Sequence, residues 1–228
     1  MKKKVAIFDI DGTIFRSSLL IELVEGLIRE GVFPSTAHKL YHQSFQNWVD
    51  RKDNYEKYIM AVVAAFMKHI KGVRYSAFKK VSDRVVISHQ DRVYRYTRDL
   101  IHDLKKRGYY LLAISQSPME LVQEFGKKMG FDKMYGRKYE VADNGKFTGK
   151  IIDLDLIADK SKVVKRAVAK EDLTLRGSYA VGDTEGDIPM LKMVDHPICF
   201  NPNKKLYDFA RKYEWDIVVE RKDMVYHL

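Results

Sequence analysis

The stretch Asp9-Ile10-Asp11-Gly12-Thr13 directly follows the apolar run Val5-Ala6-Ile7-Phe8. The apolar run predicts a buried strand, so two carboxylates stand two residues apart at the end of that strand. Burying an unpaired carboxylate is costly unless its charge is balanced or neutralised by a pKa shift. A divalent cation balances such charge, and hard oxygen ligands suit Mg²⁺. This stretch therefore predicts a metal-assisted site at the carboxyl end of a strand.

Strand and helix patterns alternate along most of the chain. The predicted strands cover residues 5–8, 109–114, 134–141, 178–181 and 196–200. Apolar residues at helical spacing lie between most of them, and residues 143–146, Asp-Asn-Gly-Lys, predict a hairpin turn. Strands that alternate with helices favour an α/β fold, a Rossmann-like, doubly wound parallel sheet with helices on both faces.

A block of consecutive predicted helices separates the first two strands. It covers residues 16–98, and its clearest helix carries one apolar stripe between Tyr55 and Ile70. The stripe indicates helix packing. We expect a small helical domain of residues 16–98, inserted into an α/β core domain made of residues 1–15 and 99–228.

The charge of the chain favours anionic ligands in general. Lys and Arg number 41 and Asp and Glu 31, which gives a net charge of +10 in 228 residues. The basic residues are scattered along the chain, and neither an aromatic single-strand platform nor a helix-turn-helix is evident. A nucleic-acid-binding or end-processing role therefore ranks last, behind a small anionic, phosphorylated substrate.

Cysteine content and hydropathy bear on location. The single cysteine, Cys199, excludes an intramolecular disulfide, which suits a reducing compartment and predicts a cytoplasmic protein. The apolar run after the first lysines ends at Asp9, so we expect no secretory signal peptide. No segment approaches the roughly 18 apolar residues of a membrane span, so no membrane partner is expected.

Polar residues with chemical potential follow several predicted strands. They are Asp9 and Asp11, Ser115, and Asp183 and Asp187, while Lys160 and Lys162 open the helix before the last of these strands. Taken singly, each has an ordinary explanation as a turn, a helix cap or a surface lysine. Ligand sites in such sheets form outside the carboxyl ends of the strands. The joint placement of these polar residues at one rim of the predicted sheet therefore favours a single site.

In this order, the segments resemble the four motifs of the haloacid dehalogenase (HAD) superfamily, in its phosphatase branch. Residues 178–191 and the segment that continues to Trp215 look like the subfamily IB hydrolases, relatives of phosphoserine phosphatase. The resemblance covers the sheet domain, whereas the helical block matches only in the position and length of a C1-type cap. It implies a Mg²⁺-dependent phosphomonoester hydrolase that acts on a small metabolite through an aspartyl-phosphate.

The resemblance also implies roles for the carboxylates. Asp9 would be the nucleophile, and Asp11 would act as the acid and then the base. The Asp9 side chain, the Asp11 backbone carbonyl and the Asp183 side chain would hold Mg²⁺. Asp187 would be an additional metal ligand or would support one. The second carboxylate, Asp11, separates the chain from the dehalogenases, which lack it.

Further residues would contact the phosphate. Ser115 would hydrogen-bond a phosphate oxygen, and the backbone N–H groups around Gln116 and Ser117 are expected to open a helix, a natural anion site. Gly12 would allow the backbone to approach the phosphate closely. A lysine would neutralise the phosphoryl group and Asp9. The family pattern leaves both Lys160 and Lys162 open, with a preference for Lys162.

Two departures from phosphoserine phosphatases bear on the substrate. Ser18 stands where those enzymes usually carry a glutamate for the substrate's amino group, and Ser115-Gln116-Ser117 replaces their usual Ser-Gly-Gly. Both argue against phosphoserine, although phosphoserine phosphatase stays an alternative. A phosphotransferase or mutase of the same superfamily is another. The sequence predicts neither the substrate nor an oligomeric state.

Overall fold

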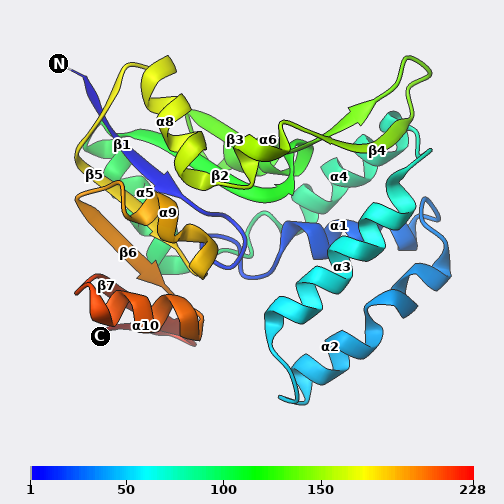
Figure 1. The fold of residues 1–228 in the computed structure, drawn as a ribbon, viewed down its shortest axis with the longest axis horizontal. Helices are drawn as coiled ribbons and strands as arrows, with labels where there is room; N and C mark the ends of the chain where they lie inside the picture. Colours follow the sequence, from blue (N-terminus) through cyan, green and yellow to red (C-terminus); the bar gives the residue numbers. More distant parts are fainter. Residues whose placement is uncertain (1) are drawn as a thin grey trace. The chain divides into compact units, whose positions relative to one another are not determined.

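The computed structural model describes residues 2–228, which form two compact units (Figure 1). The first unit comprises the chain up to Ser17, Gln90–Arg137 and Asp153–Leu228. The second comprises Ser18–His89 and Lys138–Ile152. These boundaries differ from the predicted division at residues 16–98, since residues 90–98 fall in the first unit and a hairpin joins the helices of the second.

Within the described residues, eight strands form a sheet in the order β4-β3-β2-β1-β5-β6-β7-β8. The strands are β1 Lys3–Phe8, β2 Tyr110–Pro118, β3 Lys133–Val141, β4 Phe147–Ile152, β5 Leu173–Gly182, β6 His196–Phe200, β7 Asp216–Arg221 and β8 Met224–His227. Neighbours are parallel except for β3 with β4 and β7 with β8. The chain winds outward from β1 in both directions, which confirms the predicted doubly wound fold. The carboxyl end of β1 is therefore a topological switch point, where such folds bind ligands.

Helices cover both faces of the sheet in the first unit. They are α5 Arg95–Lys106, α6 Met119–Met129, α7 Leu154–Ile157, α8 Lys160–Lys170, η2 Glu185–Asp187, α9 Ile188–Leu191 and α10 Lys204–Lys212. Residues of α8, α9 and α10 share one apolar core with alternate residues of the central strands, among them Ile7 and Leu112. The residues between these, such as Phe8, are buried as well, and Phe8 packs edge-on against Phe131 after α6. Burial on both faces explains the continuous apolar runs of the central strands.

The second unit consists of helices and the β3–β4 hairpin. The helices are α1 Leu19–Arg29, η1 Ser35–Leu40, α2 His42–Val49, α3 Tyr55–Ile70 and α4 Tyr75–His89. The stripe of α3 packs inward as predicted, and Phe66 is fully buried. Hairpin residues complete this core: Tyr139 contacts the ring of Phe66, and Phe147 contacts that of Phe78. These contacts explain why the hairpin groups with the helices.

Three local features differ from the sequence-based expectation. The strands β7 and β8 were not predicted, because their short polar-flanked segments lack a clear alternation. Strand β5 begins at Leu173, earlier than the predicted start at Ser178. A register shift in its pairing with β1, between Thr174 and Tyr179, interrupts the apolar pattern of the strand before Ser178. Helix α6 begins only at Met119, so Gln116 and Ser117 belong to β2. In the part of the chain that the structure describes, no helix has the length and apolarity that a membrane span requires.

Candidate active site

Asp9 lies at the carboxyl end of β1, in the middle of the sheet. Its backbone N–H donates to the carbonyl of Val181 on β5, 2.9 Å away, so the chain stays anchored just beyond the strand. Only 5% of its surface is exposed. Burial, together with the negative charges of Asp187 and Asp11, raises the pKa of Asp9 from 3.8 to about 7, against the opposing effect of Lys160.

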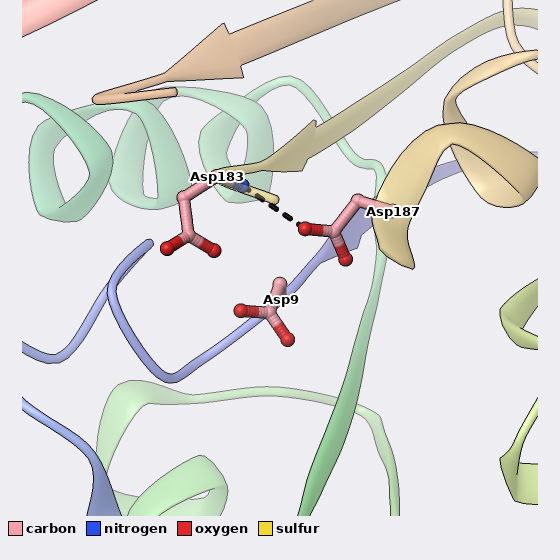
Figure 2. A group of neighbouring side chains, drawn as sticks. All are labelled: Asp9, Asp183 and Asp187. Atoms are coloured by element: carbon pink, nitrogen blue, oxygen red, sulfur yellow. Dashed lines mark hydrogen bonds between the residues drawn. The ribbon is translucent and has the colours of Figure 1, made fainter. Parts of the chain in front are cut away.

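Three carboxylates converge at this point (Figure 2). Oxygen atoms of Asp9, Asp183 and Asp187 lie within 4.8 Å of one another. Asp187 is fully buried and held by its Oδ2, which accepts from the backbone N–H groups of Asp183 and Thr184, each at 3.0 Å. Burial raises the pKa of Asp183 well above its usual range, as do the charges of Asp9 and Asp187. The β5 strand end and the β1 strand end thus supply a shared acidic cluster.

Lys160 is the cation inside this cluster. Its Nζ donates to Asp9 Oδ1 at 2.5 Å and also to Asp187 Oδ1. Burial alone would lower the pKa of Lys160, but the two carboxylates raise it above its usual range, so the lysine is charged. The side chain of the N-cap residue Asp159 accepts a hydrogen bond from the N–H of Ser161, and α8 therefore starts at Lys160. At this position the side chain of Lys160 is buried.

Lys162 lies elsewhere. It is exposed on α8, whose buried face carries Val163, Val164 and Ala167. The preference for Lys162 is therefore corrected in favour of Lys160, because a helix can direct only one of two residues so spaced into the site. Lys160 alone of the two contacts Asp9.

The acidic cluster fits a divalent cation. One lysine balances one charge, whereas three carboxylates are gathered in a desolvated space. Burial is the main cause of the raised pKa values of Asp9 and Asp183, and the neighbouring carboxylates add to the rise. Carboxylate oxygens are the ligands that hard divalent ions prefer. Asp9, Asp183 and Asp187 are the residues that could hold the ion.

Gly12 and Thr13 fit the β1 loop against Asp183. Gly12 has a φ of +82°, and a Cβ there would come within 2.2 Å of Asp183 Oδ2. Only glycine therefore combines this backbone conformation with so close an approach. Thr13 Oγ1 donates to Asp183 Oδ1 at 3.2 Å. The role of Thr13 was not predicted, although it is part of the opening stretch.

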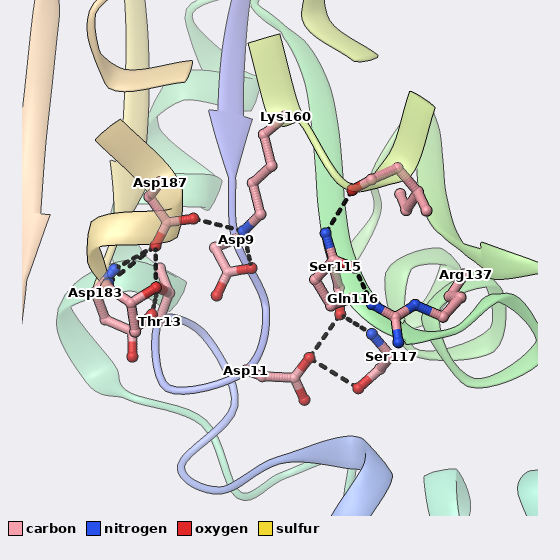
Figure 3. Close-up of polar contacts among 12 residues, drawn as sticks. Asp9, Asp11, Thr13, Ser115, Gln116, Ser117, Arg137, Lys160, Asp183 and Asp187 are labelled. Atoms are coloured by element: carbon pink, nitrogen blue, oxygen red, sulfur yellow. Dashed lines mark hydrogen bonds and ion pairs between the residues drawn. The ribbon is translucent and has the colours of Figure 1, made fainter. Parts of the chain in front are cut away.

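Asp11 points to the serines of β2 (Figure 3). Its Oδ2 accepts from Ser115 Oγ at 2.6 Å and from Ser117 Oγ at 2.9 Å. Ser115 Oγ in turn accepts from the backbone N–H of Ser117, also at 2.9 Å. Two hydroxyls therefore orient the second carboxylate, away from the three clustered ones.

Gln116 is fixed on the other side of β2. Its side-chain amide donates to the carbonyl of Ile157, and its Oε1 accepts from Arg137 at 2.6 Å. Because α6 begins at Met119, the backbone N–H groups of Gln116 and Ser117 do not open a helix, and that expectation is wrong. The N–H of Ser117 is already used by Ser115. Arg137 lies far away in sequence and carried no motif that could have indicated it.

A family model described as haloacid dehalogenase-like hydrolase matches residues 6–192. The chain belongs to this family. The matched residues include every side chain of the site described above, and family membership confirms the resemblance predicted from the motifs.

Relatives of this hydrolase carry phosphatase names. The phosphoserine phosphatase of Methanocaldococcus jannaschii is 24% identical over 225 residues, which cover 98% of this chain and 95% of the relative. The histidinol-phosphatase of Neisseria meningitidis serogroup C is 22% identical over 224 residues, 95% of this chain and 98% of the relative. The two names denote different substrates at nearly equal identity, so they agree on the reaction class and not on the substrate.

Solved structures share the fold of this hydrolase. A structure titled as a phospho-aspartyl intermediate analogue of phosphoserine phosphatase has a TM-score of 0.63 and 24% identity. The alignment covers 98% of this chain and 96% of that one. The likeness therefore extends over both units and supports the same architecture.

Proposed function

We propose that this chain is a Mg²⁺-dependent phosphomonoesterase, which hydrolyses a small phosphorylated metabolite through an aspartyl-phosphate on Asp9. The observation that carries the proposal is the contact between Lys160 and Asp9 beside the acidic cluster, with Asp11 held apart by two serines. One carboxylate is thus set up as a nucleophile, and another as an acid and base.

Mg²⁺ would be held by Asp9, Asp183 and Asp187, with the Asp11 backbone carbonyl as a further ligand. When bound, it supplies positive charge that stabilises the phosphoryl group in the transition state. Lys160 neutralises part of the negative charge of Asp9, so that a phosphate dianion can approach it. Ser115 lies beside Asp11, where its hydroxyl could bind a phosphate oxygen.

The reaction then has two half-reactions. An oxygen of Asp9 attacks phosphorus, the bond from phosphorus to the leaving oxygen breaks, and Asp11 gives that oxygen a proton. Water next attacks the aspartyl-phosphate, Asp11 takes the proton back, and inorganic phosphate leaves with Asp9 restored. Ser115 and Ser117 keep Asp11 oriented for both proton transfers.

The substrate class is a phosphorylated metabolite, as the names of the relatives suggest. The buried Ser18 caps α1 by accepting from the N–H of Leu20, so the position at which phosphoserine phosphatases carry glutamate has a structural use here. We therefore do not assign phosphoserine. A cytoplasmic location stays a prediction from the single cysteine, which is buried.

Phosphate release from a panel of phosphomonoesters tests this function. The panel includes a chromogenic aryl phosphate, and each ester is assayed with Mg²⁺ and with EDTA. We expect hydrolysis that requires Mg²⁺. Absence of hydrolysis of every ester would contradict the proposal, and turnover that needs an acceptor alcohol without phosphate release would indicate a phosphotransferase instead.

A further inference from the structure

Gln116 and Arg137 form a polar pair beside the active site, and the mechanism above assigns a role to neither side chain (Figure 3). The guanidinium of Arg137 donates to Gln116 Oε1 at 2.6 Å. The side-chain amide of Gln116 donates in turn to the carbonyl of Ile157. A carbonyl only accepts and a guanidinium only donates, so these two partners allow a single orientation of the amide. Two hydrogen bonds therefore connect β3, β2 and the end of α7.

Gln116 lies in an irregular part of β2. The register of β2 with β3 shifts between Ile114 and Pro118, and Pro118 pairs with Arg137. Residues 115–117 of β2 therefore have a single residue of β3 opposite them, so β2 bulges where it meets the site. A bulge leaves its extra residues outside the regular ladder of hydrogen bonds. Arg137, which pairs at the end of the bulge, holds the middle residue of the bulge through its side chain instead.

The position of Arg137 carries a cost in stability. Its side chain is partly buried, and within the described residues its Nε has no hydrogen-bond partner although that atom is buried. A buried donor without an acceptor destabilises the folded state. Stability alone therefore does not explain an arginine at this position, whereas a role in holding Gln116 does.

The carbonyl that Gln116 binds lies just before the lysine of the site. Ile157 is the last residue of α7, and α8 begins at Lys160 after a short turn. From that position the Nζ of Lys160 donates to Asp9 Oδ1 at 2.5 Å. A displacement of the turn between α7 and α8 would therefore move the ammonium group of Lys160 relative to Asp9.

We propose that Gln116 and Arg137 are positioning residues for Lys160. Arg137 holds the side chain of Gln116, and Gln116 anchors the turn between α7 and α8 to the carboxyl end of β2. The inference rests on the proposed phosphomonoesterase function and deepens it, because it names the side chains that set where the ammonium group of Lys160 meets Asp9. Both side chains act through Lys160 and not through contact with the substrate.

Substitutions of Gln116 separate its two hydrogen bonds. Gln116→Met removes both bonds at a similar volume, whereas Gln116→Glu keeps an acceptor for Arg137 and loses the donor to Ile157. We expect kcat/KM for an aryl phosphate to fall by about tenfold in both variants. Gln123→Met, at an exposed glutamine on α6, is the matched control and should stay within about twofold of the wild type. Full activity of Gln116→Glu would overturn the inference, since contact with Arg137 alone would then suffice.

The role of Arg137 is tested in combination with Gln116. Arg137→Met should lower kcat/KM by a similar factor, and the double variant Gln116→Met/Arg137→Met should lose no more than Gln116→Met alone, because Arg137 acts through Gln116. Arg211→Met, at an exposed arginine on α10, is the control for the loss of a positive charge. A double variant that loses the product of the two single factors would overturn the role of Arg137.

A double-mutant cycle with Lys160 distinguishes positioning from a general loss of stability. Lys160→Ala removes the group that Gln116 positions, so adding Gln116→Met should change the remaining activity by less than about twofold. A loss of about tenfold that persists in the Lys160→Ala background overturns the inference and leaves the phosphatase function standing. A structural effect of Gln116 alone would persist in this way.

Hydrogen exchange tests the link without any need for activity. Amide exchange in residues 158–162 is measured by mass spectrometry in the wild type, the two Gln116 variants and Gln123→Met. We expect exchange to be faster by about fivefold in the Gln116 variants only, because the turn between α7 and α8 loses its anchor. Unchanged exchange contradicts the inference. If no ester is hydrolysed, the phosphatase function fails by itself, and the exchange result alone decides on the link.

Discussion

Lys160 shows how one residue can organise a buried acidic site. It contacts Asp9 and Asp187 at once, and all three side chains are almost completely removed from solvent. A buried charge that loses its partner is strongly destabilising. Lys160 therefore stabilises the buried carboxylates of the site, and it also reduces the negative charge that would repel an approaching phosphate.

Replacing each lysine in turn tests whether Lys160 or Lys162 is the lysine that the reaction needs. We predict that Lys160→Ala lowers kcat/KM for an aryl phosphate by about 100-fold or more and also lowers the melting temperature, since two buried carboxylates lose their counter-charge. Lys162→Ala is the matched control, on the exposed face of the same helix, and should retain activity within about twofold. Steady-state kinetics and thermal melts measure both effects. The reverse pattern would contradict the assignment of Lys160.

Gly12 gives a second prediction at this scale. Gly12→Ala should abolish most activity and weaken metal binding, because the new Cβ would displace the Asp183 carboxylate. Gly108→Ala is the matched control: its φ is +80°, and nothing lies within 4 Å of the added Cβ. It carries the same backbone strain without the clash. Equal losses of activity in the two variants would mean that strain alone, and not contact with Asp183, explains the effect.

Helix α8 depends on its first residues. Asp159 accepts from the N–H and the hydroxyl of Ser161, and this cap sets the helix start at Lys160. We predict that Asp159→Ala costs about 1 kcal/mol of unfolding free energy and lowers activity by about tenfold, because Lys160 is no longer held in place. Urea unfolding and kinetics measure the two quantities.

Another cap controls for the loss of stability. Asn54 caps α3 in the second unit by accepting from the N–H of Lys57. Asn54→Ala should cost a similar free energy with no comparable loss of turnover on a small aryl phosphate. If both variants lose activity equally, the effect of Asp159 is global and not transmitted through Lys160.

How much of each element was predictable depended on its pattern. The continuous apolar runs of β1 and β2 were predicted because both faces of these strands are buried, and the stripe of α3 was predicted because one face of the helix is buried at the helical period. Strands β7 and β8 and the start of α6 were not. Gln116 and Ser117 read as a helix opening, yet pairing of Pro118 with Arg137 of β3 keeps this segment in the sheet. Such a tertiary contact leaves no local signal.

The site residues at strand ends were predictable from the sequence, whereas those that depend on contacts across the fold were not. Asp9, Asp11, Asp183 and Asp187 follow strands and Ser115 lies near the end of β2, and the parallel sheet brings these strand ends together. The choice between Lys160 and Lys162 depended on which way one helix faces, which spacing alone did not determine. Thr13 and Arg137 act through contacts across the fold and were missed.

For the molecule as a whole, the acidic cluster ties stability to pH and metal. The pKa of Asp9 is raised from 3.8 to about 7, so between these values the folded state binds a proton that the unfolded state has released. The stabilising contribution of this group is therefore present at low pH and lost as the pH rises through about 7. The pKa of Asp183 is shifted in the same direction.

Mg²⁺ should offset this loss. In EDTA we predict that Asp9 and Asp183 make the melting temperature of the protein lower at pH 8 than at pH 5. Saturating Mg²⁺ should raise the melting temperature at pH 8 by roughly 5 °C and by much less at pH 5, where protons compete for the carboxylates. Asp9→Asn should lose most of this pH-dependent stabilisation. An equal Mg²⁺ effect at both pH values in the wild type would contradict the proposed ligand set.

The role of Asp9 as the nucleophile can be tested most directly with Asp9→Asn. Phosphate release by the variant and the wild type is measured with Mg²⁺, and acid-quenched wild-type reactions are analysed by peptide mass spectrometry. We predict that the variant loses activity by about 1,000-fold or more while staying folded, and that a phosphoryl group is trapped on the wild-type peptide that contains Asp9. Full turnover by Asp9→Asn, or a phosphoryl group trapped on a different residue, would contradict the proposed mechanism.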